Sequence, residues 1–307
     1  MFVVNKLIKE SDLHATIQLL DHQAEETNTD NFVPRSQLEG PINALGFLQR
    51  SVLFAELSKL AYLDRADAGQ FACQVGLPEV RYYDRDGAQA YLLGNIHDVV
   101  VVCRGTEPDE WNDVKKDVDA KKSVSETVGW VHRGFKYEVD ELWPRLEQAL
   151  VSNCRTLWFT GHSLGGAMAM ICAGRCKLSD IRSNPRALFT YGAPRVGNKR
   201  YVNYVKLECY RWVNNNDIVP RLPPSWLGYR HSGLELYLSA KGQVRPVTGW
   251  KRSKDQVQRL LRGLVQGRPD SISDHLLDEY IKHLCHALRQ SEAGRLRLKL
   301  PSDESDR

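Results

Sequence analysis

The chain has 307 residues, of which 42% are hydrophobic and 26% are charged. These proportions are close to those of soluble globular proteins and exclude a disordered or fibrous chain. The 42 basic and 38 acidic residues leave a formal net charge of +4, which is too balanced for a typical nucleic-acid-binding protein. Apolar runs such as residues 99–103 are far shorter than the ~18 residues of a membrane span, so no transmembrane segment is expected.

The start of the chain and its cysteines bear on the cellular compartment. Residues 1–12 mix a few apolar side chains with charged ones and contain no stretch of signal-peptide length. The seven cysteines are an odd number without a Cys-x-x-Cys pair, which fits neither a disulfide framework nor a zinc ribbon. We therefore expect a reducing, cytoplasmic location, with export by a route other than Sec as the open alternative.

Three regions follow one another along the chain. Residues 1–45 contain three basic and seven acidic side chains, and their polar stretches are typical of an N-terminal extension outside the core. Residues 46–290 hold the regular patterns described below and are expected to form one domain. Residues 291–307 form a polar C-terminal tail.

The first part of residues 46–290 combines a helix with a strand meander. Apolar residues at roughly helical spacing predict a helix over residues 45–63. Three short β-branched or aromatic segments follow, separated by Asp-Gly and Gly-Asn turns. They predict strands over residues 80–83, 88–93 and 99–103.

Strands and helices alternate in the next part of the chain. The predicted strands are residues 156–160, 187–191 and 209–213. The predicted helices are residues 164–177 and a segment from about residue 199. This alternation indicates right-handed βαβ units, and therefore an α/β fold with a mainly parallel sheet and helices on both faces.

A basic segment precedes the last helix. Residues 241–270 contain eight basic and two acidic side chains, a local charge of +6, and residues 253–265 carry a capping box and an apolar helical face. An amphipathic helix with a solvated basic face explains this composition, and contact with anionic lipid head groups is the alternative. A last helix is predicted over residues 274–289.

A Gly-x-Ser-x-Gly motif spans residues 161–165, with Ser163 at its centre. By itself the motif is weak, and a glycine-rich turn with an ordinary serine is the alternative. Its position between an apolar strand and an Ala-rich helix is the setting of a sharp strand-to-helix turn that exposes a nucleophilic serine. The amide of Leu164 would then point toward a developing oxyanion at the helix N-terminus.

A nucleophilic serine needs a base and an acid that orients the base. Asp217 follows the strand over residues 209–213, at the sheet edge where α/β proteins place ligand chemistry. An Asx-turn before Pro220 is the competing explanation. Among the histidines that follow, we select His275, which lies where a loop meets the last helix, and keep His231 as the fallback.

Two further histidines and a threonine complete the candidates. His283 and His286 lie inside the predicted last helix, where they form a polar face or, alternatively, a pair of metal ligands. Thr106 follows the strand over residues 99–103, so its amide could serve as the second oxyanion donor. It could also act as a plain N-cap.

Several sequence blocks occur in the order seen in class 3 lipases. The blocks are residues 101–107 (VVCRGTE) with Trp111, 131–135 (VHRGF), 161–167 (GHSLGGA), 191–198 (YGAPRVGN), 215–224 (NNDIVPRLPP) and 274–275 (DH). The chain resembles this family, whose members are α/β-hydrolases similar to the fungal triacylglycerol lipases. The match extends over about residues 53–288.

The resemblance implies a role for each of these positions. Ser163, Asp217 and His275 correspond to the catalytic triad, Thr106 and Leu164 to the oxyanion hole, and the segment after Thr106 to a helical lid. The lid candidate, residues 107–121, contains six acidic residues and three lysines and has only a narrow apolar stripe. We therefore expect weak interfacial activation, because such a stripe buries little apolar area.

These features predict a serine-dependent carboxylic ester hydrolase that cleaves acyl esters of lipids and needs no metal or organic cofactor. Its expected partner is a lipid or small ester substrate, with peripheral contact to lipid surfaces and no nucleic acid. A phospholipase A1 or a short-chain or aryl esterase on the same triad is one alternative. A non-catalytic lipase-like interaction protein is the other. The oligomeric state stays open.

Overall fold

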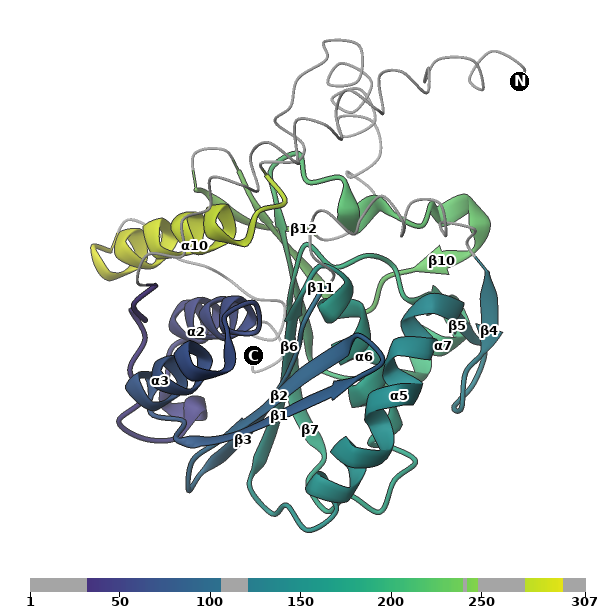
Figure 1. Ribbon diagram of the computed structural model, residues 1–307. Coiled ribbons are helices and arrows are strands. Elements are labelled where there is room, and N and C mark those ends of the chain that lie inside the picture. The colour runs from purple at the N-terminus through teal and green to yellow at the C-terminus, as the bar shows by residue number, and fades with distance from the viewer. Residues whose placement is uncertain (1–31, 106–120, 240–241, 248–273, 295–307) are drawn as a thin grey trace, which may run out of the picture.

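A mixed sheet forms the centre of the molecule. The computed structural model describes residues 32–105, 121–239, 242–247 and 274–294, and in this part of the chain the main sheet has eight strands in the order β1-β2-β3-β6-β7-β9-β11-β12 (Figure 1). The strands are β1 (Glu79–Arg85), β2 (Ala88–Gly94), β3 (Asp98–Cys103), β6 (Thr156–His162), β7 (Pro185–Tyr191), β9 (Cys209–Asn214), β11 (Leu234–Leu238) and β12 (Val244–Val247). Strands β3, β6, β7, β9 and β11 run parallel, whereas β1, β2 and β12 pair antiparallel at the two edges. The predicted α/β fold with a mainly parallel sheet is confirmed.

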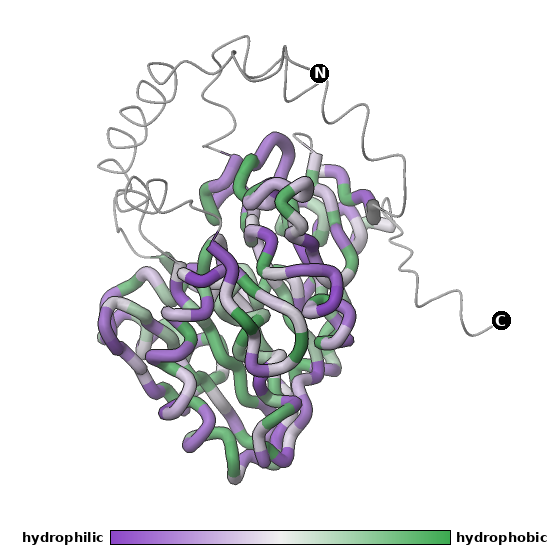
Figure 2. The backbone as a smooth tube through the Cα atoms, turned by 90° about the vertical axis from the view of Figure 1, so that its right-hand side faces the viewer, coloured by the Kyte–Doolittle hydropathy of each residue, from purple (hydrophilic) through white to green (hydrophobic). Residues whose placement is uncertain are grey.

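Helices cover both faces of this sheet (Figure 1). On one face lie α2 (Phe47–Leu60), α3 (Arg65–Val75) and α10 (Leu277–Glu292), and on the other α5 (Arg133–Leu150), α6 (Leu164–Arg175) and α7 (Lys199–Val205). Since neither face meets water, the central strands are apolar along their length, and every residue of β3 is buried. Figure 2 shows the hydrophobic stretches running through the interior of the molecule.

Each face of the sheet has its own apolar core. On the α2 face, the Phe54 ring packs against Trp158 and Phe189, with ring centroids 5.4 Å and 4.6 Å apart. On the α6 face, Phe159 belongs to a buried cluster that includes Ile171 of α6. The two cores fix α2 and α6 against the same parallel strands, and the residues at the carboxyl ends of those strands are fixed with them.

A small second sheet lies beside the main one (Figure 1). Its strands, in the order β10-β8-β5-β4, are β10 (Tyr229–Arg230), β8 (Gly197–Asn198), β5 (Trp130–His132) and β4 (Lys122–Val124). Short 3-10 turns η2 (Ile42–Ala44), η3 (Val219–Arg221) and η4 (Ser225–Leu227) complete the described elements. Because the segments of the small sheet follow β3, β7 and β9, the sheet belongs to the carboxyl end of the parallel strands.

The element boundaries differ from the predicted ones at several places. Helices α3 and α5 and the small sheet were not predicted, and the last helix begins at Leu277 instead of residue 274. The predicted lid over residues 107–121, apart from its last residue, and the predicted helix over residues 253–265 lie outside the described residues. Most of the basic segment 241–270 lies outside them as well. Weak interfacial activation therefore stays a prediction.

The end of the predicted N-terminal extension packs against the domain. The Ile42 side chain is fully buried, and its amide donates a hydrogen bond of 2.8 Å to Oδ2 of the buried Asp98. Glu56 in α2 accepts hydrogen bonds from the amides of Arg35 and Ser36, each of 3.0 Å. Ile42 is part of the core, and Arg35 and Ser36 are tied to α2, in contrast to the expected location of residues 1–45 outside the core. The domain boundaries at residues 45 and 290 stay predictions.

Among the described helices, none combines the length and the apolar character needed to cross a membrane.

Candidate active site

Ser163 stands on a sharp turn between a strand and a helix. Strand β6 ends at His162, Ser163 adopts φ 55° and ψ −130°, and α6 begins at Leu164. A positive φ is rare for a residue with a side chain, and such backbone strain is typical of functional sites. The Ser163 amide donates to the Tyr191 carbonyl (2.9 Å), and the Ser163 carbonyl accepts from the Gly166 amide (3.0 Å). These two bonds stabilise the strained turn.

The glycines of the motif are required by close backbone contacts. A Cβ added at Gly161 would lie 2.4 Å from the carbonyl carbon of Gly165. A Cβ added at Gly165 would lie 2.2 Å from the carbonyl oxygen of Cys103 in β3. Both distances are far below a normal contact, so only glycine lets α6 begin directly beside β3 and β6.

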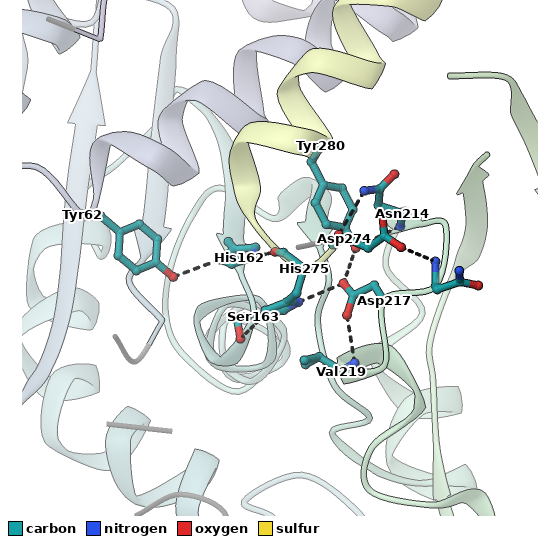
Figure 3. A network of polar contacts seen from close by, with 10 residues as sticks. Tyr62, His162, Ser163, Asn214, Asp217, Val219, Asp274, His275 and Tyr280 are labelled. Carbon is teal, nitrogen blue, oxygen red and sulfur yellow. Dashed lines mark hydrogen bonds and ion pairs between the residues drawn. The ribbon is translucent and has the colours of Figure 1, made fainter. Parts of the chain in front are cut away.

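Three predicted residues from distant parts of the sequence meet at this turn (Figure 3). His275 Nε2 lies 3.0 Å from Ser163 Oγ, and His275 Nδ1 lies 2.9 Å from Asp217 Oδ2. Ser163 and Asp217 are buried, and the His275 side chain is 16% exposed. The structure thus brings Ser163, His275 and Asp217 into one hydrogen-bonded chain.

The partners of His275 determine its tautomer. A carboxylate only accepts hydrogen bonds, so Nδ1 carries the proton and donates it to Asp217. In the neutral ring Nε2 is then an acceptor, which faces the hydroxyl of Ser163. This is the arrangement in which an imidazole can take the proton of a serine.

Two further donors hold the Asp217 carboxylate. Tyr280 in α10 donates its hydroxyl to Oδ2 at 2.5 Å, and the Val219 amide donates to Oδ1 at 2.9 Å. Burial, together with the charge of Asp217, raises the pKa of Tyr280 well above its ordinary value, which keeps this donor protonated. The bond to Val219 is the Asx-turn considered from the sequence, so the turn and the contact with His275 occur together.

Gly192 leaves room for the contact between acid and base. It adopts φ 61°, and a Cβ at this position would lie 2.8 Å from Asp217 Oδ2 and 2.9 Å from His275 Nδ1. A side chain here would separate the two groups. The glycine that follows Tyr191 is therefore needed at the site itself.

The loop that carries His275 is tied to the loop that carries Asp217. Asp274 Oδ2 accepts from Asn215 Nδ2 (3.0 Å) and from the Asn216 amide (3.1 Å). Asn214 Nδ2 donates to the Asp274 carbonyl at 3.0 Å. The run of three asparagines before Asp217 thus fixes the loop of His275 as well as its own.

His162 supports His275 from the other side (Figure 3). Its Nε2 lies 2.8 Å from the His275 carbonyl oxygen and must donate to it, so Nδ1 accepts from the Tyr62 hydroxyl at 3.1 Å. Burial, with a smaller contribution from the nearby His275, lowers the pKa of His162 well below its ordinary value. Tyr62 also contacts the amide of Gly105, next to Thr106, and its burial raises its pKa.

The remaining predicted residues are placed as follows. Leu164 is the first residue of α6, directly after Ser163, whereas Thr106 lies outside the described residues. His231 Nε2 lies 2.6 Å from the Pro220 carbonyl oxygen, where it braces the loop instead of meeting Ser163. His283 Nδ1 lies 2.8 Å from Asn214 Oδ1, and the described residues contain no group of three or more His, Cys, Asp or Glu that could hold a metal ion.

Sequence reasoning missed the supporting residues of the site. Tyr62, His162, Tyr280 and Asp274 were not assigned any contact with Ser163, Asp217 or His275. Their positions in the sequence gave a partial signal, because His162 and Asp274 directly precede Ser163 and His275. Tyr62 and Tyr280 come from α2's end and from α10, and only the packing of these helices brings them to the site.

Comparison with known proteins supports the resemblance. The family model for lipase (class 3) matches residues 100–226. Over this region the chain is therefore similar to class 3 lipases. Secreted mono- and diacylglycerol lipase 1 of Fusarium solani is 39% identical over 117 residues, which are 35% of this chain and 34% of that protein. A lipase of Rhizopus niveus is 35% identical over 136 residues, covering 41% of this chain and 35% of that protein.

The similarity to solved structures extends over more of the chain. Lipase II from Rhizopus niveus aligns with a TM-score of 0.58 at 24% identity, covering 68% of this chain and 89% of that one. This likeness establishes the shared α/β-hydrolase fold. The sequence matches themselves span only about a third of the length of the curated relatives.

The predicted cytoplasmic location is wrong. It conflicts with the match to the Fusarium solani lipase, which is named as a secreted protein. The cysteine count was a poor guide because five of the seven free cysteines, Cys103, Cys172, Cys176, Cys209 and Cys285, are buried. A buried cysteine packs as a small hydrophobic residue, so its presence says little about the redox state of the compartment.

Proposed function

We propose that the protein is a serine-dependent carboxylic ester hydrolase that cleaves acyl esters of lipids. The observation that carries the proposal is the continuous chain from Asp217 through His275 to Ser163, with distances of 2.9 Å and 3.0 Å, at a strained strand-to-helix turn. A serine, a base and an acid with this connectivity form the arrangement that activates a serine hydroxyl.

In the proposed first half-reaction, Ser163 Oγ bonds to the ester carbonyl carbon while His275 Nε2 takes the hydroxyl proton. The carbonyl electrons move onto oxygen, and Asp217 stabilises the imidazolium that forms. When the tetrahedral intermediate collapses, the alkoxide leaves with the proton from His275, and the acyl group stays on Ser163.

The second half-reaction reverses these roles with water. His275 takes a proton from a water molecule, whose oxygen attacks the acyl carbonyl. The collapse of this intermediate releases the carboxylic acid, and Ser163 Oγ recovers the proton from His275. The reaction consumes one water molecule and leaves the enzyme unchanged.

The oxyanion of both intermediates is proposed to bind backbone amides. The Leu164 amide is a free donor of the first turn of α6, where the helix dipole also favours negative charge. Thr106 is the proposed second donor, following Gly105 at the end of the β3 segment. The contact of Tyr62 with Gly105 and His162 supports this assignment, because it connects that segment to the turn of Ser163.

The proposed substrate class is drawn from the relatives. The similar proteins are lipases, one of them a mono- and diacylglycerol lipase, so lipid acyl esters are the first substrates to test. Turnover of p-nitrophenyl esters of increasing chain length, triglycerides and phospholipids would distinguish a lipase from a phospholipase A1 or a short-chain esterase.

The mechanism is tested with Ser163→Ala. We expect the variant to lose at least ~10⁴-fold in kcat on p-nitrophenyl esters, and to lose labelling by a fluorophosphonate. Because Ser163 is 1% exposed and alanine is smaller, the variant should fold. Retained turnover in Ser163→Ala would refute the proposal, and absence of labelling in the unmodified protein would favour a non-catalytic interaction protein.

A further inference from the structure

Large apolar side chains are exposed together on η4 and the small sheet. Trp226 is 84% exposed, Val124 is 79% exposed, and Leu227 is 40% exposed. Gathered apolar exposure of this kind marks a surface that contacts a partner or a lipid phase. We call these three residues, together with Trp130, Lys122 and Arg230, the interfacial patch.

The patch is continuous along the small sheet. Val124 pairs with Trp130 across β4 and β5, so their side chains are neighbours on one face. The Trp130 ring lies against Gly228, where an added Cβ would be 3.2 Å from Trp130 Cζ2. Gly228 directly follows Leu227, which connects Trp130 to η4 without a gap.

Rigid contacts hold η4 in position. Arg195 Nη1 donates to the Pro223 carbonyl at 3.0 Å, and Arg230 Nη1 donates to the Ser225 carbonyl at 2.6 Å. Pro223 and Pro224 precede the turn and restrict its backbone. Little conformational freedom is therefore lost when Trp226 enters another phase.

The patch lies at the same end of the molecule as Ser163. Ser163 follows β6, and the strands and turns of the patch follow β3 and β9, which run parallel to β6. All these connections leave from the carboxyl ends of the strands. A surface that receives Trp226 would therefore lie on the side of the molecule that contains the serine.

The charge of this region favours an anionic surface. Lys122 Nζ lies 4.5 Å from the centroid of the Trp130 ring, and Arg230 is exposed beside η4. The residues of β4, β5, β8, β10 and η4 include these two cations and no acid. Tryptophan beside lysine and arginine is the composition of surfaces that enter the head-group layer of membranes.

We propose that the interfacial patch is the surface with which the protein rests on an anionic lipid–water interface. Trp226 and Leu227 enter the head-group layer, and Lys122 and Arg230 contact the anionic groups. The inference rests on the proposed function in one respect, since it orients Ser163 toward a lipid phase that holds its substrate.

The test measures vesicle binding in the Ser163→Ala background, so the vesicle lipid is not hydrolysed. Co-sedimentation is followed with vesicles of phosphatidylcholine alone and of phosphatidylcholine mixed with phosphatidylglycerol. Trp226→Ser is expected to lower the partition coefficient about tenfold on the mixed vesicles. Lys122→Gln is expected to reduce the preference for the mixed vesicles by about fivefold.

Ile96→Ser is the matched control. Ile96 is 83% exposed but lies in the turn between β2 and β3, at the opposite end of the parallel strands, so its substitution should not change binding. The inference would be overturned if the Ser163→Ala parent did not bind vesicles, or if Trp226→Ser bound them as well as that parent. It would also be overturned if Trp226→Ser and Ile96→Ser lost binding equally. An unchanged preference in Lys122→Gln would overturn the assignment to anionic head groups. Unfolding midpoints check that each variant folds, and esterase assays of the unsubstituted chain test the proposed function separately.

Discussion

The side chains around Ser163 are held by partners from α2's end, β6, the β9 loop and α10. His162 and Asp274 fix the backbone of the His275 loop, and Tyr280 and Val219 fix the carboxylate of Asp217. These contacts leave His275 little freedom to rotate away from Ser163. At this scale, the precision of the site comes from buried hydrogen bonds to groups that do not themselves meet a substrate.

Tyr280→Phe tests the support of the acid. The Tyr280 hydroxyl donates to Asp217 and accepts from the Asn214 amide at 3.0 Å, so its removal leaves a buried N–H without its acceptor. We expect the free energy of unfolding to fall by ~1–3 kcal/mol, and kcat to fall more than KM changes. Urea unfolding and ester kinetics measure both effects. Tyr210→Phe is the control, because that hydroxyl makes only a 3.5 Å contact with Glu208 at an exposed position. Equal effects of the two substitutions would contradict the assigned role of Tyr280.

The lowered pKa of buried His162 predicts that the free energy of unfolding depends on pH. Burial lowers the pKa of His162 in the folded chain, whereas an unfolded histidine binds its proton near pH ~6.5. The unfolded state therefore binds more protons below that pH. The stability associated with neutral His162 is fully present above pH ~6.5 and is lost as the pH falls, by ~1.4 kcal/mol per pH unit until the folded-state pKa is reached.

The measurement compares urea unfolding of the unsubstituted chain and His162→Gln between about pH 7 and pH 5. The glutamine does not titrate, so the variant should lose stability less steeply over this range, although it is less stable at pH 7. Parallel pH profiles for the two proteins would mean that folding does not lower the pKa of His162.

At the scale of elements, the sequence pattern predicted most of the central sheet but not all the helices. The apolar runs of β3, β6 and β7 are short and β-branched or aromatic, which identifies buried strands. Helix α5 was missed, and Pro144 inside it is a local signal against a helix. Its buried face, which includes Val139, Leu142 and Leu146, packs against the sheet and outweighs that local cost.

At the scale of elements, we predict that a side chain at Gly165, in the strand-to-helix turn, destabilises the packing of α6 against β3. Gly165→Ala places a Cβ 2.2 Å from the Cys103 carbonyl oxygen, so β3 and α6 must move apart. We expect a loss of at least ~2 kcal/mol in the free energy of unfolding, together with loss of ester hydrolysis. Gly69→Ala in α3 is the matched control, because no atom lies within 4 Å of its added Cβ.

Gly69→Ala should stabilise the protein by ~0.5–1 kcal/mol, since alanine is favoured over glycine inside a helix. Thermal unfolding of both variants gives the sign of each effect. A Gly165→Ala variant as stable as the unsubstituted chain would show that the close approach of α6 to β3 is wrong. A destabilised Gly69→Ala would contradict only the expected gain from helix propensity in α3.

At the scale of the whole molecule, residues 32–45 link distant elements. Their contacts reach Glu56 in α2 and Asp98 in β3, and Phe32 stacks on Phe71 of α3 with ring centroids 5.0 Å apart. The polar, acidic composition of residues 1–45 gave no sign of these contacts with the domain, because only a few side chains of the segment make them. Composition averages over a segment, whereas burial is decided residue by residue.

The domain boundary at residue 45 can be tested by truncation. A chain that begins at residue 46 loses the buried Ile42 side chain and leaves Asp98 Oδ2 without the donor at Ile42. We expect it to be less stable than a chain that begins at residue 32 by at least ~3 kcal/mol. Urea unfolding of the two truncated chains measures this difference, and equal stability would place the boundary at residue 45 as predicted.

The sequence alone determined the α/β class, the order of the central strands and helices, and the three residues that meet at the candidate site. It could do so because burial on both faces makes strands uniformly apolar, and because the turn, the asparagine run and the residues before α10 are local patterns. The tertiary structure decided which side chains support His275 and Asp217, how the loops that carry these two residues are tied together, and where apolar groups stay exposed. Those outcomes depend on the packing of segments that are 50 to 110 or more residues apart in the sequence, as the 112-residue separation of His275 and Ser163 illustrates. No local pattern encodes such distances.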